Sequence, residues 1–141
     1  MIAVSTSGDA IVIGGGPAGS MVAMRLAEAG RRVTLIEKER AAHHKVCGEF
    51  LSREAIHYLH QVGISPLDLG GSVIGNVRLS SGNTVTASPL PFGAVSLSRS
   101  TLDEALLSRA SETGCQVIRG FAVESIAHRD DIWTATLSNG G

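Results

Sequence analysis

Short apolar runs and an amphipathic segment alternate along the first part of the chain. Residues 10–13 form an apolar run that ends at glycines, and residues 33–36 form a second, β-branched run. Such continuous runs are typical of buried parallel strands. Between them, apolar residues recur at helical spacing from Pro17, whose fixed φ suits a first helical turn, to Gly30, which can end the helix. The pattern predicts a strand–helix–strand unit.

Two further helices are predicted downstream. Ser52 can cap a helix over residues 52–62, where apolar positions follow one helical face. Ser100 with Asp103 three positions on resembles a capping box, which predicts the start of another helix. Apolar residues at helical spacing continue this second helix to its expected end at Gly114.

The remaining segments show the alternation and the turn residues of strands. Residues 73–87 alternate around Ser81-Gly82-Asn83, which predicts a hairpin. Pro89 and Pro91 are expected to end that hairpin, so residues 94–97 are predicted to form a separate strand. Three more strands are expected, a parallel one over residues 116–119 and a meander over residues 122–128 and 132–138 around Asp130-Asp131.

Composition restricts the class of protein. The 141 residues are 43% hydrophobic and 18% charged, which is typical of a folded domain rather than a disordered chain. The net charge is −1 and no basic stripe marks a nucleic-acid surface. The N-terminal residues lack the pattern of a signal peptide, and no apolar run is long enough to span a membrane. We therefore expect a cytoplasmic protein that acts on small molecules, with an oligomeric state that the sequence does not indicate.

The segment Gly14-Gly15-Gly16-Pro17-Ala18-Gly19 matches the G-x-G-x-x-G pattern of dinucleotide-binding loops. It follows a predicted strand and opens a predicted helix, which is the context that gives the pattern its meaning. Gly14 permits the tight turn, Gly16 lets a pyrophosphate approach the backbone, and Gly19 lets the helix pack closely. Glu37, at the end of the next strand, can accept hydrogen bonds from ribose hydroxyls and disfavours a 2′-phosphate. The pattern alone leaves NAD and FAD open.

Four segments resemble known flavoproteins. The stretch Asp9 to Glu37 resembles the N-terminus of FAD-dependent oxidoreductases of the glutathione-reductase-like Rossmann type. The stretch Lys45-Val46-Cys47-Gly48-Glu49 resembles the Lys-x-Cys-Gly-Glu segment of the geranylgeranyl reductase-like branch, whereas flavin halogenases carry Gly-Glu-Ser and this chain has Phe50 in place of that Ser. The stretch Ser98 to Asp103 resembles the Arg-x-x-Leu-Asp opening of a helix that these enzymes share with aromatic hydroxylases. Gly120 to Val123 resembles the segment whose valine backbone meets the adenine.

The resemblance implies FAD as the cofactor, with NAD(P)H as the electron donor. The loop from Gly14 to Gly19 would hold the pyrophosphate, and Glu37 would bind the adenosine ribose with Lys38 beside it. Cys47 and Gly48 would lie near the isoalloxazine, and Arg99 would reach the phosphate and ribitol region. The implied cofactor-binding residues are Gly14, Gly16, Pro17, Ala18, Gly19, Glu37, Lys38, Cys47, Gly48, Arg99 and Val123. No catalytic residue and no metal ligand is indicated.

The resemblance also implies the architecture. The expected fold is α/β, a Rossmann-like FAD-binding domain with a parallel sheet, helices and a β-meander. Residues 1–69 and 98–141 would form this domain, and residues 70–97 would begin the sheet of a substrate domain. The Asp-Gly pair that forms a second FAD motif in these proteins does not occur in the 141 residues. The chain is therefore expected to be the N-terminal part of a longer flavoenzyme and to be inactive alone.

Two reactions compete within this resemblance. One is the reduction of an isoprenoid double bond, and the other is the hydroxylation of an aromatic or polyketide-like substrate with NAD(P)H and oxygen. Halogenation is a third possibility, which Phe50 disfavours. A hypothesis of a different class is a non-catalytic module that binds a dinucleotide.

Overall fold

The computed structural model describes residues 7–47 and 49–139, which form two compact units. The first unit takes the chain up to residue 43 and from residue 103 onward, and the second takes residues 44–102. The elements in chain order are β1 (Ala10–Ile13), α1 (Pro17–Glu28), β2 (Val33–Glu37), β3 (Phe50–Leu51), α2 (Arg53–Gln61), β4 (Ser72–Ser81), β5 (Thr84–Ser96), α3 (Arg99–Glu112), β6 (Gln116–Arg119), β7 (Phe121–Arg129) and β8 (Ile132–Asn139).

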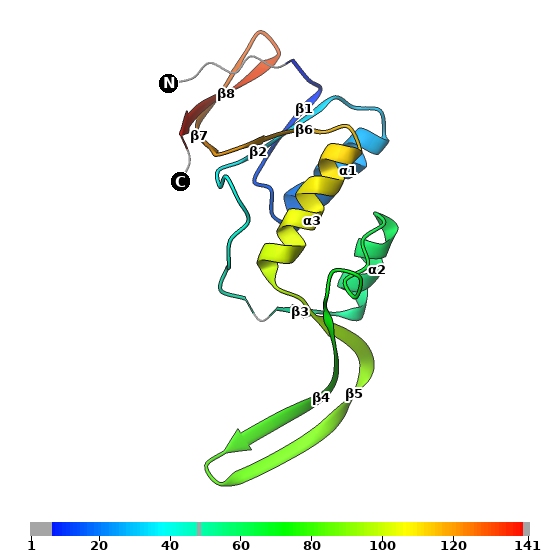
Figure 1. Ribbon diagram of the computed structural model, residues 1–141. Coiled ribbons are helices and arrows are strands. Elements are labelled where there is room, and N and C mark those ends of the chain that lie inside the picture. Colours follow the sequence, from blue (N-terminus) through cyan, green and yellow to red (C-terminus); the bar gives the residue numbers. More distant parts are fainter. Residues whose placement is uncertain (1–6, 48, 140–141) are drawn as a thin grey trace. The chain divides into compact units, whose positions relative to one another are not determined.

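A parallel sheet in the order β1-β2-β6 forms the centre of the first unit (Figure 1). In its register Val12 lies beside Leu35, which lies beside Val117. Because successive side chains of a strand point to opposite faces, these three residues share one face of the sheet. Met24 of α1 and Leu106 of α3 are fully buried, as is Leu35. The predicted strand–helix–strand unit and its third parallel strand are confirmed.

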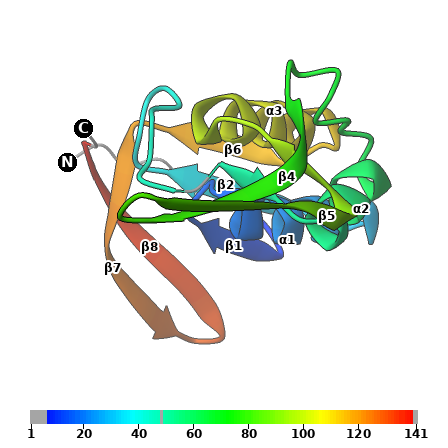
Figure 2. The same cartoon turned by 90° about the horizontal axis from the view of Figure 1, so that it is seen from below.

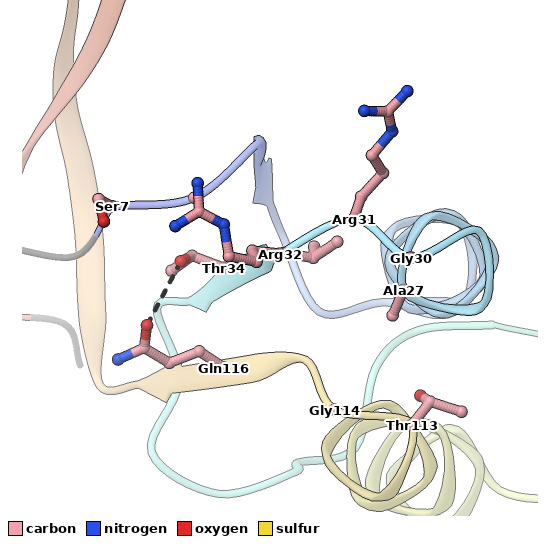
Figure 3. A pocket seen from close by; sticks show the side chains of 11 residues that line it. Ser7, Ala27, Gly30, Arg31, Arg32, Thr34, Thr113, Gly114 and Gln116 are labelled. Carbon is pink, nitrogen blue, oxygen red and sulfur yellow. Dashed lines mark hydrogen bonds between the residues drawn. The ribbon is translucent and has the colours of Figure 1, made fainter.

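The antiparallel hairpin β7–β8 lies on the other side of the strands from the helices α1 and α3 (Figures 2 and 3). Its turn is formed by Asp130 and Asp131, both with positive φ (50° and 59°), as two-residue hairpin turns require. Leu137 is buried, whereas Trp133 stays exposed and stacks on His128 with ring centroids 4.5 Å apart. The predicted meander is therefore present, and the first unit has the layers of the expected α/β fold.

The second unit contains α2 and a sheet in the order β3-β5-β4. Ser52 accepts a hydrogen bond from the Ala55 N–H (3.3 Å) and so caps α2 as predicted. The turn of the long hairpin lies at Gly82 and Asn83, also as predicted. The core of the second unit is apolar and includes Leu51, Leu59, Val62, Ile64, Val95 and Leu97.

The expected break at Pro89 and Pro91 is wrong, because β5 continues through both prolines to Ser96 and includes all but the last residue of the strand expected at residues 94–97. Pro89 lies opposite Asn76, after which the register shifts, and pairing resumes at Ala94 opposite Ile74. Pro91 falls inside this irregularity, where a missing N–H costs no ladder hydrogen bond.

The capping box expected at Ser100 is also wrong. Helix α3 begins at Arg99, and the Ser98 hydroxyl accepts the Thr101 N–H at 3.2 Å. Ser98 is therefore the capping residue, while Ser100 lies inside the first turn with its hydroxyl 3.0 Å from that of Ser98. Asp103 is buried within the helix.

Candidate cofactor site

The glycine loop connects β1 to α1 and lies at the carboxyl end of the central strands. The Gly14 N–H donates to the Ile36 carbonyl at 2.8 Å, which fixes the loop to the end of β2. Gly14 has a φ of +98°, a conformation that favours glycine. A Cβ on Gly19 would stand 1.9 Å from the Gly14 carbonyl oxygen. Only glycine at position 19 therefore permits the helix to come this close to the loop.

The N-terminus of α1 is open to a ligand. Its capping residue is Gly16, in an extended conformation (φ −72°, ψ −179°), so no side chain caps the helix. Pro17 is the first helical residue, and the first turn carries no acidic side chain. The first N–H groups of a helix lack partners within the helix and carry partial positive charge. The arrangement therefore suits an anion such as a pyrophosphate.

Glu37 joins the end of β2 to the glycine loop. Its side chain is buried, and its Oε2 accepts the Gly15 N–H at 2.6 Å. Its Oε1 accepts the Glu39 N–H at 3.0 Å. Both oxygens of the carboxylate are thus oriented by backbone donors, at the strand end where the sequence predicted a ribose-binding acid.

Gly15 also belongs to this loop, at a position that the G-x-G-x-x-G pattern leaves unspecified. A Cβ at this position would stand 2.6 Å from the Leu107 side chain and 3.1 Å from the Glu37 side chain. The loop is therefore packed between α3 and the carboxylate. The signal was present as a third consecutive glycine where the binding pattern requires only two.

Arg119 and Glu104 form a second group beside Glu37. Arg119 is the register partner of Glu37 at the end of β6. Its two terminal nitrogens donate to the two carboxylate oxygens of Glu104 at 2.8 and 2.9 Å. These hydrogen bonds are the main reason why the pKa of Glu104 lies below its ordinary value and that of Arg119 above it. Nothing in the sequence pattern pointed to this pair, because its members are 15 positions apart on different elements.

Two other predicted contact residues lie in the first unit. Lys38 follows Glu37 directly, and its exposed ammonium lies 3.5 Å from the Glu39 carboxylate. Val123 lies in β7 opposite Leu137, at the edge of a register shift that ends at Ser125. A bulge of this kind releases backbone groups from the ladder. The roles of Lys38 and Val123 stay predictions.

The remaining predicted contact residues belong to the second unit or lie outside the described part. Cys47 is exposed, and its sulfur accepts the Glu49 N–H at 3.3 Å. Arg99 is the first residue of α3 and is half-buried. Gly48 lies outside the described residues. The predicted contacts of these three residues with the flavin or its phosphates stay predictions.

A cavity of about 320 Å³ lies at the other end of the strands and is distinct from the glycine loop. It is lined by the C-terminal ends of α1 and α3 and by the first residues of β2 (Figure 3). The Thr34 hydroxyl and the Gln116 side-chain oxygen face each other there at 3.5 Å. In open α/β sheets, ligands bind beyond the carboxyl ends of the strands, so we expect the cofactor at the glycine loop and not in this cavity.

No helix of the described residues combines the length and the apolar character that crossing a membrane requires.

Comparisons with known proteins agree with this geometry. The family model described as FAD binding domain matches residues 7–141. The chain is 29% identical to a menaquinone reductase of Mycobacterium tuberculosis over 99% of its own length and 36% of that protein. It is 35% identical to a flavin-dependent halogenase of Armillaria mellea over 96% of its own length and 27% of that protein. The chain thus spans about a third of the length of its relatives.

The fold recurs in solved structures. A geranylgeranyl bacteriochlorophyll reductase-like protein from Thermoplasma acidophilum matches with a TM-score of 0.74 at 23% identity. The match covers 94% of this chain and 35% of that one. At this identity the likeness speaks for the fold, and it confirms the Rossmann-like architecture expected from the sequence. Together with the family match over nearly the whole chain, it establishes that the protein belongs to the FAD-binding domain family of flavoproteins.

Proposed function

We propose that this chain is the FAD-binding part of a flavin-dependent oxidoreductase and holds the adenosine diphosphate half of FAD. The observation that carries the proposal is the close approach of Gly19 to Gly14 below an uncapped helix N-terminus. The pyrophosphate would accept hydrogen bonds from the loop and from the first turn of α1. The buried Glu37 carboxylate would accept hydrogen bonds from the ribose hydroxyls.

The other residues of the site are assigned by the same proposal. Pro17 and Ala18 would line the pyrophosphate with their backbone, Lys38 would lie beside the ribose, and the main chain of Val123 would meet the adenine. Cys47 and Gly48 would lie near the isoalloxazine, and Arg99 near the phosphate and ribitol region. When bound, FAD would supply electron transfer between NAD(P)H and the substrate, while the protein supplies binding and orientation. We also propose that residues 70–97 form the start of a substrate domain.

For the reaction, we propose reduction of a double bond in an isoprenoid substrate. Three relatives at 29% to 31% identity are named menaquinone reductases, which agrees with a reductase rather than a hydroxylase. The solved structure from Thermoplasma acidophilum, which has the same fold, is described as geranylgeranyl bacteriochlorophyll reductase-like. The Lys45 to Glu49 segment, which resembles the geranylgeranyl reductase-like branch, supports this choice.

Halogenation is the second candidate. Two halogenases of Armillaria mellea are 35% and 31% identical to this chain. Against it stands Phe50, which occupies the position of a serine in the halogenase segment and lies in β3 opposite Ser96. Hydroxylation of an aromatic or polyketide-like substrate, the reaction that competes with reduction in the sequence resemblance, is a further candidate and is supported by the helix opening at Arg99.

A titration of the purified chain with FAD tests the cofactor assignment. We expect flavin fluorescence to be quenched to an endpoint near one FAD per chain, with much weaker binding of NAD. Gly19→Ala should abolish FAD binding, because its Cβ would collide with the backbone of Gly14. Gly75→Ala is the matched control, since a Cβ there meets nothing within 4 Å. Preference for NAD, or unchanged affinity in a folded Gly19→Ala variant, would contradict the proposal.

The reaction is tested on the full natural gene product. Its flavin is reduced anaerobically with NADH or NADPH, and the loss of visible flavin absorbance measures this reduction. A geranylgeranyl compound, an aromatic substrate with oxygen, and an aromatic substrate with halide are then offered in turn. A saturated isoprenoid product supports the first candidate, whereas a halogenated or hydroxylated product would replace it.

A further inference from the structure

Arg119 places a positive charge at the edge of the sheet that carries Glu37. The two residues are register partners in the parallel pair β2–β6. Their strands therefore lie roughly 4.8 Å apart at this point, and their side chains leave the same face of the sheet. Helix α3 covers that face, because a Cβ on Gly15 would meet the side chains of both Glu37 and Leu107. Arg119 binds Glu104 of the same helix. An arginine and a buried carboxylate thus share one small region beside the glycine loop.

Within the described residues, Arg119 and Glu37 nevertheless form no ion pair with each other. The Glu37 carboxylate accepts two backbone N–H groups, at 2.6 and 3.0 Å. The two terminal nitrogens of Arg119 donate instead to the two oxygens of Glu104, at 2.8 and 2.9 Å. A bidentate, charge-assisted pair of this kind fixes the plane of the guanidinium. Glu104 therefore determines where the charge of Arg119 lies.

The Nε of Arg119 shows that this orientation leaves one donor unsatisfied. The atom is buried, and no described residue accepts a hydrogen bond from it. A buried donor without a partner is destabilising. The Glu104 side chain is also 53% exposed, so water screens its attraction for the arginine, whereas Glu37 is buried. If Glu104 lost its charge, the buried carboxylate of Glu37 would become the competing acceptor for Arg119.

We propose that Glu104 holds Arg119 away from Glu37 and thereby keeps the Glu37 carboxylate free to bind a ribose. The inference rests on the proposed function, because it takes the adenosine diphosphate half of FAD as the ligand. Glu104 is then a positioning residue, which acts through Arg119 and touches no ligand. Without the Glu104 charge, Arg119 pairs with Glu37, and the ribose hydroxyls must compete with a guanidinium for the same oxygens.

The first test is a titration of single and double variants with FAD. Glu104→Gln keeps the shape of the side chain but removes its charge, so the Kd for FAD should rise about tenfold, the effect of one charge-assisted hydrogen bond. Glu104→Gln combined with Arg119→Gln removes the competing cation as well. This double variant should bind FAD within about twofold of wild type. A general structural defect at position 104 would not be relieved by a second substitution.

Glu112→Gln is the matched control for the loss of a carboxylate from α3. Glu112 is the last residue of the helix and pairs with Arg109 at 3.1 Å, away from the strand end that carries Glu37. This substitution should leave the Kd for FAD unchanged. Melting temperatures are recorded for all variants, so that each titration is made well below the unfolding transition.

The second test observes the arginine itself in the absence of cofactor. In protein with isotope-labelled arginine, the Nε–Hε NMR signal of Arg119 is assigned by its loss in Arg119→Gln. We expect Glu104→Gln to shift this signal. Adding Glu37→Gln should shift it strongly in the Glu104→Gln background and only slightly in the wild-type background, because Arg119 contacts Glu37 only after Glu104 has lost its charge.

The outcomes separate this inference from the proposed function. Weaker FAD binding in Glu104→Gln that is restored in the double variant supports the inference. An unchanged Kd in Glu104→Gln, or a double variant that binds as weakly as the single one, would overturn it, because Glu104 would then be an ordinary structural ion pair. If wild type binds no FAD, the proposed function fails and the role toward a ribose fails with it. The NMR signal then still decides whether Glu104 keeps Arg119 apart from Glu37.

Discussion

Gly14, Gly15 and Gly19 of the loop between β1 and α1 are glycine for different physical reasons. Gly14, Gly19 and Glu37 were predicted because each has a fixed place in a local pattern that the structure reproduces. Gly15 was overlooked, since its reason for being glycine is the approach of Leu107 from a helix far along the chain. The spacing of residues along the sequence is enough to predict Gly14, Gly19 and Glu37. The reason for Gly15 is visible only in a contact between segments that are distant in the sequence.

The two cysteines differ in environment and should differ in reactivity. Cys115 is buried, and burial raises the pKa of its thiol above the ordinary value. Because only the thiolate reacts, Cys115 should be alkylated by iodoacetamide at least about tenfold more slowly than the exposed Cys47 at neutral pH. Peptide mass spectrometry during the reaction measures both rates. Equal rates in the native protein would show that the Cys115 region opens readily, and Cys47→Ser isolates the slower signal.

At the scale of elements, local patterning predicted most boundaries, and the failures have local causes. The bounds of β1 and the start of α1 were predicted because glycine and proline mark them. The path of β5 through two prolines was not, because a proline is excluded from a strand only where its N–H would be needed. The order β1-β2-β6 depends on contacts between distant segments, which periodicity does not report.

The cap of α3 offers a direct test of the corrected helix start. Ser98→Ala removes the acceptor for the Thr101 N–H and should lower the free energy of unfolding by about 1 kcal/mol. Ser100→Ala, inside the first turn, is the matched control and should change it by at most about 0.5 kcal/mol. Urea denaturation followed by circular dichroism measures both. A larger loss in Ser100→Ala would restore the capping box that the sequence suggested.

The start of the central sheet predicts a pH dependence. Asp9 accepts the Arg32 backbone N–H at 2.9 Å and the Arg32 side chain at 3.1 Å, which join the chain before β1 to the chain before β2. These bonds, the backbone one first, lower the pKa of Asp9 below its ordinary value. Their stabilisation is present above the pKa of the unfolded state and is lost as the pH falls through the lower folded-state pKa.

The corresponding measurement is the melting temperature of wild type and Asp9→Asn between neutral pH and about pH 2. We expect wild type to be the more stable protein at neutral pH and the difference to shrink below about pH 4. Asp68→Asn, at an exposed carboxyl in the second unit, serves as the comparison. A constant difference between wild type and Asp9→Asn at all pH values would contradict the assigned cause.

At the scale of the whole molecule, the predicted cofactor contacts are divided between the two units. The glycine loop, Glu37 and Val123 belong to the first, whereas Cys47 and Arg99 belong to the second. A ligand at 100 times its Kd stabilises the part that binds it by about 2.7 kcal/mol, and amide exchange reports this for each part separately. If FAD uses both sets of contacts, the slow-exchanging amides of α1 and of α2 should both gain protection when FAD is added.

We expect this double gain in protection. If only α1 gains it, the chain binds the adenosine diphosphate half alone, and the roles of Cys47 and Arg99 fall. If Arg99 provides the second unit's contribution to FAD binding, Arg99→Gln should remove the gain in amide protection at α2. Most of the gain at α1 should remain. Amide protection measured separately at α1 and at α2 therefore tests whether both units contribute to FAD binding, as the sequence resemblance implies.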